Sequence, residues 1–72
     1  MVPYKNNNGN SGVQAYEIGP DYITVKFTNT IRTYTYSYSK AGKEYVETMK
    51  QLAENGAGLN SFINRYVQKL YD

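Results

Sequence analysis

Three tyrosines stand at alternate positions in the stretch RTYTYSYSK, residues 32 to 40. Small hydroxyl residues separate Tyr34, Tyr36 and Tyr38, so a strand over this stretch would carry a row of phenol rings on one face. Exposed aromatic rings can stack on the bases of a single-stranded nucleic acid. Buried, the same rings can form the core of a small domain. The neighbouring elements decide between these two uses.

Basic residues are the second group that could bind a nucleic acid. Three of the eight lysines and arginines precede a glutamate by four residues, in the pairs Lys40–Glu44, Lys43–Glu47 and Lys50–Glu54, which is typical of solvated helix surfaces. The other five are Lys5, Lys26, Arg32, Arg65 and Lys69.

Among these, we expect Lys26, Arg32 and Arg65 to contact phosphates, and Tyr38 to offer a partly covered ring for stacking. Ordinary solubilising charge is the alternative for the basic residues, and packing at a helix start is the alternative for Tyr38. The formal net charge of +2 permits an acidic partner without requiring one.

Catalytic residues of the common kinds are missing from the chain. It has no histidine and no cysteine, and most of its six carboxylates fall at helix-surface or turn positions. General-base, thiol and zinc chemistry therefore lack their usual groups. Gly56 and Gly58 precede a helix without the lysine and hydroxyl residue of a phosphate-binding loop. We expect a protein that is not an enzyme and that uses no metal and no cofactor.

The chain also lacks the patterns of membrane insertion and export. No apolar run approaches the roughly 20 residues that cross a bilayer, and the first residues do not form a basic segment followed by an apolar one. We expect no membrane partner and a cytoplasmic location.

Secondary-structure elements position the candidate residues, and the hydrophobic periodicity that predicts these elements changes along the chain. The polar stretch KNNNGNSG predicts a flexible N-terminal arm over residues 1–12, followed by a single domain over residues 13–72. Residues 13–18 and 22–27 have the composition and alternation of strands, with a turn at Gly19-Pro20-Asp21 between them, and the tyrosine-rich stretch forms a third strand.

Two amphipathic helices follow the strands. One starts after Ser39, a candidate N-cap, and stops at Asn55-Gly56. The other carries apolar residues at helical spacing from Leu59 to near Tyr71. We therefore predict an α+β fold in which an antiparallel sheet of about three strands precedes two helices packed on one face.

The length of the loop before the third strand decides where the tyrosines point. An even loop pairs Val25 with Tyr34 and Ile23 with Tyr36, which places these tyrosines on the core face. A three-residue loop would reverse the parity and expose them, but such loops favour a glycine that this turn lacks. We favour the core.

The predicted core combines the apolar faces of the strands and helices, with Val13 and Val67 at its margins. Its members are Tyr16, Ile18, Ile23, Val25, Phe27, Tyr34, Tyr36, Tyr45, Met49, Leu52, Phe62, Ile63, Tyr66 and Leu70.

The order of short motifs resembles the KTSC domain, which is found in short bacterial proteins and at the C-terminus of some lysyl-tRNA synthetases. The matching pieces cover most of the chain and are SGV at 11–13, IGPD at 18–21, VKF at 25–27, YTY at 34–36, YVETM at 45–49 and GLNSFINRY at 58–66. The chain departs from the family at Pro20, at Asn29, where a nearby glycine is usual, and at Leu59.

The resemblance implies a small non-enzymatic domain for which RNA binding has been suggested. An RNA-binding module is therefore our leading expectation. A protein-interaction module, such as an accessory protein of a bacterium or phage, is the alternative. Clustered basic residues in the structure would favour RNA, whereas an exposed apolar patch would favour a protein partner.

Overall fold

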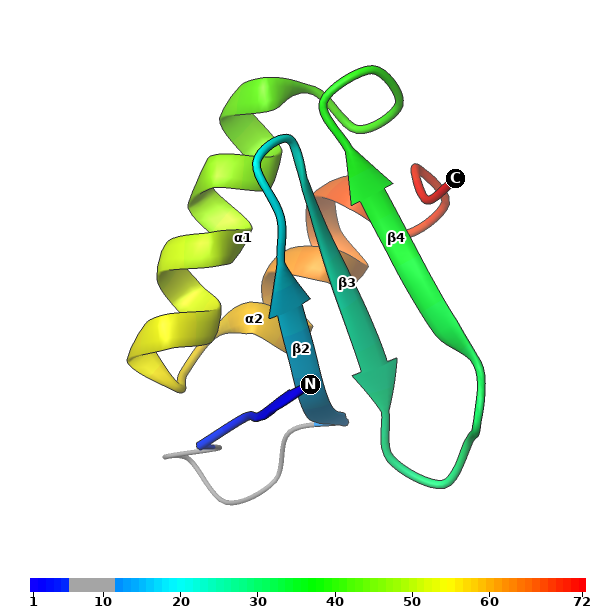
Figure 1. Ribbon diagram of the computed structural model, residues 1–72, viewed down its shortest axis with the longest axis vertical. Helices are drawn as coiled ribbons and strands as arrows, with labels where there is room; N and C mark the ends of the chain where they lie inside the picture. The colour runs from blue at the N-terminus through cyan, green and yellow to red at the C-terminus, as the bar shows by residue number, and fades with distance from the viewer. Residues whose placement is uncertain (6–11) are drawn as a thin grey trace.

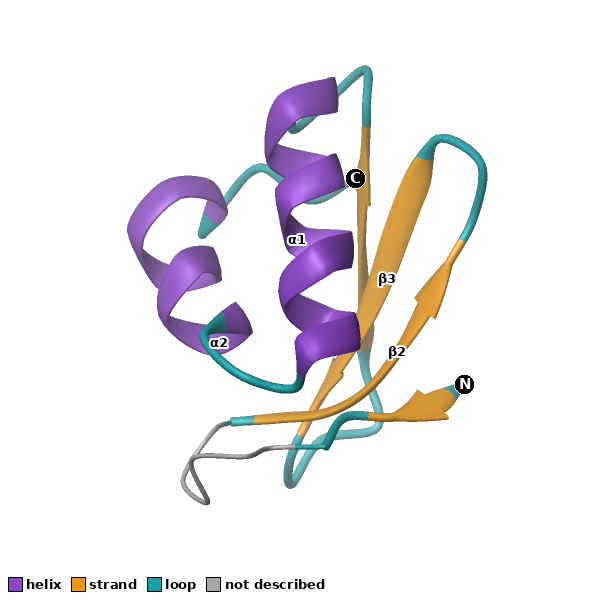
Figure 2. Cartoon of the chain, turned by 90° about the vertical axis from the view of Figure 1, so that its left-hand side faces the viewer, coloured by secondary structure: helices purple, strands orange, loops and turns teal. Residues whose placement is uncertain are grey.

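An antiparallel sheet forms one layer of the protein and two helices form the other (Figure 1, Figure 2). The computed structural model describes residues 1–5 and 12–72. The four strands lie in the order β1 (Val2–Pro3), β2 (Val13–Ile18), β3 (Tyr22–Phe27) and β4 (Thr33–Ser37). The helices are α1 (Lys43–Asn55) and a C-terminal helix in which α2 (Leu59–Phe62) continues as the π-helical turn η1 (Ile63–Val67). The predicted α+β arrangement is confirmed.

The sheet has one strand more than the sequence predicts. Strand β1, which comes from the segment expected to be a flexible arm, pairs with Ala15 and Tyr16 of β2. The next residue, Tyr4, is buried, and its N–H donates to the Gln14 carbonyl at 2.9 Å. A two-residue strand that contains a proline has no alternation that a sequence pattern could detect. The rest of the expected arm, residues 6–11, lies outside the described residues.

Strands β3 and β4 pair in the predicted register. Val25 stands opposite Tyr34 and Ile23 opposite Tyr36, so the side chains of both tyrosines point to the helix-covered face. The connection between the strands reverses direction without glycine because Asn29 adopts a φ of 68°, a left-handed conformation that asparagine tolerates better than most residues. The prediction that Tyr34 and Tyr36 face the core is confirmed.

Helix α1 starts later than predicted and stops where predicted. Its N-cap is Gly42, with a φ of 100°, while Ser39 lies in the turn that follows β4. The expected cap at Ser39 is therefore wrong, because the chain completes this turn before the helix begins. Gly56 ends the helix with a φ of 77°, and its N–H donates to the Leu52 carbonyl at 3.0 Å. This left-handed ending is one that glycine makes without steric cost.

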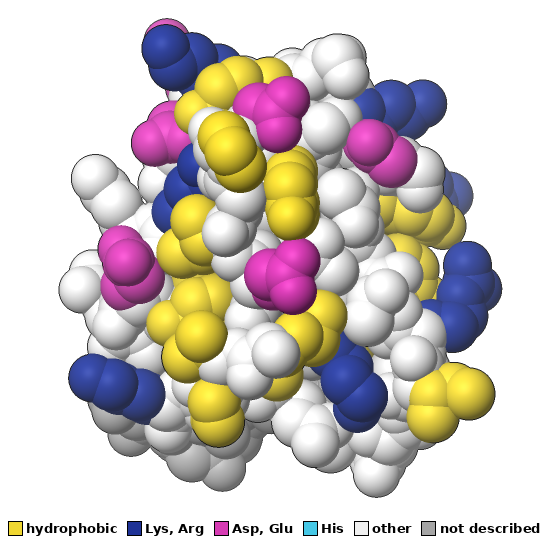
Figure 3. All heavy atoms as spheres, in the orientation of Figure 1, with side chains coloured by type: hydrophobic (Ala, Val, Ile, Leu, Met, Phe, Trp, Pro, Cys, Tyr) yellow, Lys and Arg dark blue, Asp and Glu magenta, His cyan; other side chains and the backbone are white. Residues whose placement is uncertain are grey.

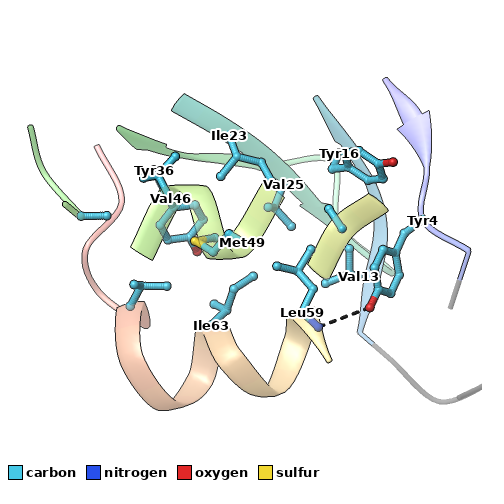
Figure 4. Close-up of a cluster of buried hydrophobic side chains, with 13 residues drawn as sticks. Tyr4, Val13, Tyr16, Ile23, Val25, Tyr36, Val46, Met49, Leu59 and Ile63 are labelled. Atoms are coloured by element: carbon cyan, nitrogen blue, oxygen red, sulfur yellow. Dashed lines mark hydrogen bonds between the residues drawn. The ribbon is translucent and has the colours of Figure 1, made fainter. Parts of the chain in front are cut away.

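The hydrophobic core lies between the sheet and the helices (Figure 4). Side chains from the sheet point toward those of the helices, and the two layers meet around Met49. The buried apolar residues are Tyr4, Val13, Tyr16, Ile23, Val25, Tyr36, Ala41, Val46, Met49, Ala53, Leu59, Ile63 and Val67. Val13 and Val67 are thus fully inside the core rather than at its margins.

Three predicted core residues are exposed. Ile18, Tyr45 and Tyr66 keep 38%, 39% and 47% of their surface in contact with solvent. Helix α1 instead buries Val46, Met49 and Ala53. The helical period was correct and Met49 is buried as predicted, but the buried face of α1 extends toward Val46 and Ala53 rather than toward Tyr45 and Leu52.

Candidate nucleic-acid interface

Lys26 lies on the face of the sheet that the helices leave open. Its ammonium group donates to the Gln14 side-chain oxygen at 2.6 Å. On the same face the hydroxyls of Thr24 and Thr35 lie 2.8 Å apart. Figure 3 looks onto this face and shows mostly uncharged polar surface over β3 and β4, with basic side chains toward the margins. Among the described residues, no basic cluster surrounds Lys26 on this face.

Tyr38 belongs to a polar network beside α1. Its hydroxyl donates to the Glu47 carboxylate, which also pairs with Lys50 at 2.9 Å. Lys50 thus pairs with Glu47 rather than with the predicted Glu54. The hydrogen bond from Tyr38, followed by that from Lys50, holds the pKa of Glu47 below its ordinary value. The Lys50 ammonium also lies 5.4 Å from the centroid of the Tyr38 ring, so the ring already has a cation against it.

Arg32 immediately precedes β4 and lies over an aromatic ring. Its guanidinium carbon is 5.1 Å from the centroid of the Tyr34 ring, a cation–π contact. The backbone N–H of Arg32 donates to the Thr30 hydroxyl at 3.1 Å. Because Tyr34 and Thr30 both line a groove beside β4, Arg32 stands at the rim of that groove.

This β4 groove is an open depression of about 430 Å³ between the sheet and the C-terminal helix. Its lining residues are Phe27, Thr30, Tyr34, Tyr36, Ile63, Asn64, Gln68, Lys69 and Tyr71. The volume falls within the range of small-ligand sites, which is roughly 300–1,000 Å³. The groove can therefore hold a planar group the size of a nucleobase.

Aromatic rings form the apolar wall of the β4 groove. The Tyr34 ring packs edge-to-face on Phe27 and on Tyr71, with centroid distances of 5.6 and 4.8 Å. Tyr71 also meets Tyr36 at 6.3 Å. Burial raises the pKa of Tyr36 to about 12, with smaller contributions from Tyr34 and Tyr71. Tyr36 therefore stays neutral at physiological pH and belongs mainly to the core.

The C-terminal helix supplies the polar wall of the groove. Asn64 and Gln68 are exposed, and we find no hydrogen-bond partner for their side chains among the described residues. Their amides can both donate and accept, as the edge of a base requires. Lys69 adds a positive charge to the lining of the groove. Sequence reasoning missed Asn64, Gln68 and Tyr71 as site residues, although their spacing of four and three residues would place them along one side of a helix.

Arg65 lies beside a second group of aromatic residues, on the side of the C-terminal helix that faces α1. Tyr45, Phe62 and Tyr66 form this aromatic cluster, with centroid distances of 5.8, 5.7 and 4.8 Å for its three pairs. The guanidinium carbon of Arg65 is 5.8 Å from the centroid of the Tyr66 ring.

The structure thus does not bring the four predicted residues into one patch. Arg32 borders the β4 groove, Arg65 borders the aromatic cluster, and Lys26 and Tyr38 lie elsewhere, in separate contacts. The two arginines share one feature, because each guanidinium lies over a tyrosine ring.

Neither a metal-binding group nor a membrane-spanning helix is found in the described part of the chain. No three acidic, histidine or cysteine side chains within residues 1–5 and 12–72 gather closely enough to hold a metal ion. Across the same residues, none of the helices has the length and apolar character needed to cross a bilayer.

The fold and the groove define a small α+β domain with an aromatic, basic-edged groove at one side of its sheet. Comparisons with models of protein families, with curated proteins and with solved structures found no match. The resemblance to the KTSC domain therefore rests on the sequence motifs alone.

Proposed function

We propose that the protein is a small binding module for single-stranded RNA and that the β4 groove receives an unpaired base. The observation that carries the proposal is a groove lined by aromatic rings and by Lys69, with Arg32 held against one of those rings, Tyr34. Proteins that bind single strands combine these two features, because bases stack on rings while cations follow the phosphates.

Each part of the groove has a role in this proposal. The guanidinium plane of Arg32, resting on Tyr34, offers a flat cationic surface on which a base can stack. Lys69 neutralises a phosphate, and the amides of Asn64 and Gln68 meet the edge of the base. We choose RNA rather than DNA as the ligand because the chain resembles the KTSC domain, which occurs at the C-terminus of some lysyl-tRNA synthetases.

The first prediction concerns the salt dependence of RNA binding. If Arg32 and Lys69 each neutralise one phosphate at the groove, a plot of log affinity against log salt concentration has a slope near −1.4, from about −0.7 per contact. Replacing Arg32 with alanine removes one contact, so we expect weaker binding and a slope reduced by about 0.7. Fluorescence anisotropy of a labelled single-stranded RNA at several salt concentrations measures both quantities.

Three further variants locate the site. Lys40→Ala, at an exposed position outside the groove, is the matched control and should change binding little. Lys26→Ala and Tyr38→Ala test the wider site that the sequence predicts. If either weakens binding as much as Arg32→Ala, the site extends beyond the β4 groove. Absence of RNA binding by the wild-type protein even at low salt would contradict the proposed function.

The aromatic cluster supports a protein-interaction module as the second candidate function. Tyr45 and Tyr66 expose two large rings side by side, and such rings are frequent anchors in protein interfaces. A pull-down from native lysate, with and without nuclease, separates the two candidates. Partners that persist after nuclease treatment would favour the protein interface, whereas their loss would favour RNA.

A further inference from the structure

The C-terminal helix separates the β4 groove from the aromatic cluster. Asn64 and Gln68 project from one side of it into the groove, whereas Phe62 and Tyr66 project from another side toward Tyr45. Its third side, formed by Leu59, Ile63 and Val67, is buried in the core. One short helix therefore presents a ring-lined surface on each flank.

Basic charge accompanies both flanks of this helix. Lys69 lines the groove, and Arg65 lies over the Tyr66 ring, so a ligand that covers Tyr66 meets a positive charge. Residues 59–71 contain no acidic residue. Each flank thus offers one basic side chain to an anionic ligand, although Asp72 follows Tyr71 at the groove, whereas a purely apolar partner would have to desolvate Arg65.

The C-terminal helix also changes its local geometry along its length, where the α-helical turn of α2 gives way to a π-helical turn. Residues Ile63–Val67 form a π-helical turn, a rare conformation that is frequently found at functional sites. This wider turn contains Asn64, Arg65 and Tyr66 in succession. Asn64 lines the groove, Arg65 is exposed to solvent, and Tyr66 belongs to the aromatic cluster.

We propose that one RNA strand crosses the C-terminal helix, placing a base in the β4 groove and another base on Tyr66. In this arrangement Lys69 and Arg65 bind the phosphates between the two bases. The inference rests on the proposed function and adds a second base site to it. Because a helix with its side chains is roughly 10 Å across, the two bases cannot be adjacent nucleotides that remain stacked on each other.

The length of the RNA tests this inference. We would titrate oligoadenylates of about two, four and eight nucleotides by fluorescence anisotropy. The wild-type affinity should rise steeply once the oligonucleotide is long enough to reach both sites, by roughly tenfold or more for the second stacked base. If the two sites bound bases independently, the affinity would rise only gradually with length, because a longer RNA offers more positions at which one base can bind.

Variants of the aromatic cluster connect the length dependence to the second site. Tyr66→Ala should weaken binding of the eight-nucleotide RNA by roughly tenfold and weaken binding of the two-nucleotide RNA much less. Tyr66→Phe is the matched control, because it keeps the ring and should keep most of the affinity. Arg65→Ala should reduce the salt slope for the longer RNA by about 0.7. Thermal unfolding of each variant verifies that it is folded.

The outcomes separate the inference from the function on which it rests. If RNA of all lengths binds alike and Tyr66→Ala behaves as wild type, the strand does not cross the helix, while RNA binding in the groove stands. If no RNA binds at any length, the proposed function fails and the inference fails with it. The aromatic cluster would then be a surface for a protein partner.

Discussion

Individual tyrosines in this protein have different surroundings, and these differences give them different chemical properties. The Tyr36 ring is buried with 1% of its surface exposed, whereas Tyr45 and Tyr66 keep large parts of their rings in solvent. The alternating row therefore does not act as a single surface. Tyr36 fills the core, Tyr34 lines the groove, and Tyr38 holds Glu47.

The buried Tyr36 predicts a loss of stability in alkali. Burial raises its pKa to about 12, above the ordinary value of 10.0, so the unfolded chain releases this proton first. The stabilisation is complete below pH 10 and is lost as the pH rises toward 12. We expect the urea midpoint to fall more steeply for the wild type than for Tyr36→Phe across this range. Parallel pH profiles for the two proteins would contradict the prediction.

At the level of elements, strand β1 is attached by a short backbone ladder and by one buried side chain, that of Tyr4. Its ladder to β2 is only two residues long, but the ring of Tyr4 continues into the core, with 6% of its surface exposed. The Tyr4 hydroxyl accepts a hydrogen bond from the Leu59 N–H at 3.3 Å, as the dashed line in Figure 4 shows. The N-terminal strand is thereby connected to the start of the C-terminal helix.

Two substitutions at Tyr4 separate the contributions of its ring and its hydroxyl. Tyr4→Phe removes one hydrogen bond and should lower the free energy of unfolding by about 1 kcal/mol. Tyr4→Ala also leaves a cavity and should cost about 3 kcal/mol or more. Urea denaturation measures both values. If Tyr4→Ala costs no more than Tyr4→Phe, the ring does not contribute to the core.

At the level of the whole molecule, one core connects both ends of the described chain. The buried cluster runs from Tyr4 to Val67, and the Cα radius of gyration of 10.7 Å agrees with about 11 Å for a compact domain of this length. The two layers have no separate cores that would let one unfold without the other. Domains of this size usually unfold in a single cooperative step.

Cooperative unfolding predicts that a destabilising substitution near the C-terminus also lowers the stability of the sheet. Val67 is fully buried, so Val67→Ala should lower the stability of the domain by about 1–3 kcal/mol. We expect hydrogen exchange of the core amides in β2 to accelerate by the corresponding factor, because they exchange through global unfolding. Unchanged protection in β2 would show that the C-terminal helix opens independently of the sheet.

The sequence by itself determined the features that depend on local pattern and loop length. The alternation in β3, the parity of the loop around Asn29 and the stop at Gly56 predicted the register, the core position of Tyr36 and the end of α1. Strand alternation and the left-handed preference of glycine act within a few residues. These features can therefore be predicted without knowledge of distant contacts.

Only the tertiary structure decided how distant segments meet. Lys69 lines the groove that Arg32 borders although the two residues are 37 positions apart in the sequence, and β1 joins the sheet where Tyr4 enters the core. The rotation of α1 that buries Val46 and exposes Tyr45 is likewise set by packing against its neighbours. Helical periodicity requires an apolar stripe on α1, but two overlapping stripes satisfy it. One runs through Tyr45 and Leu52, the other through Val46 and Ala53, and Met49 belongs to both. The choice between them depends on how the two layers fit together.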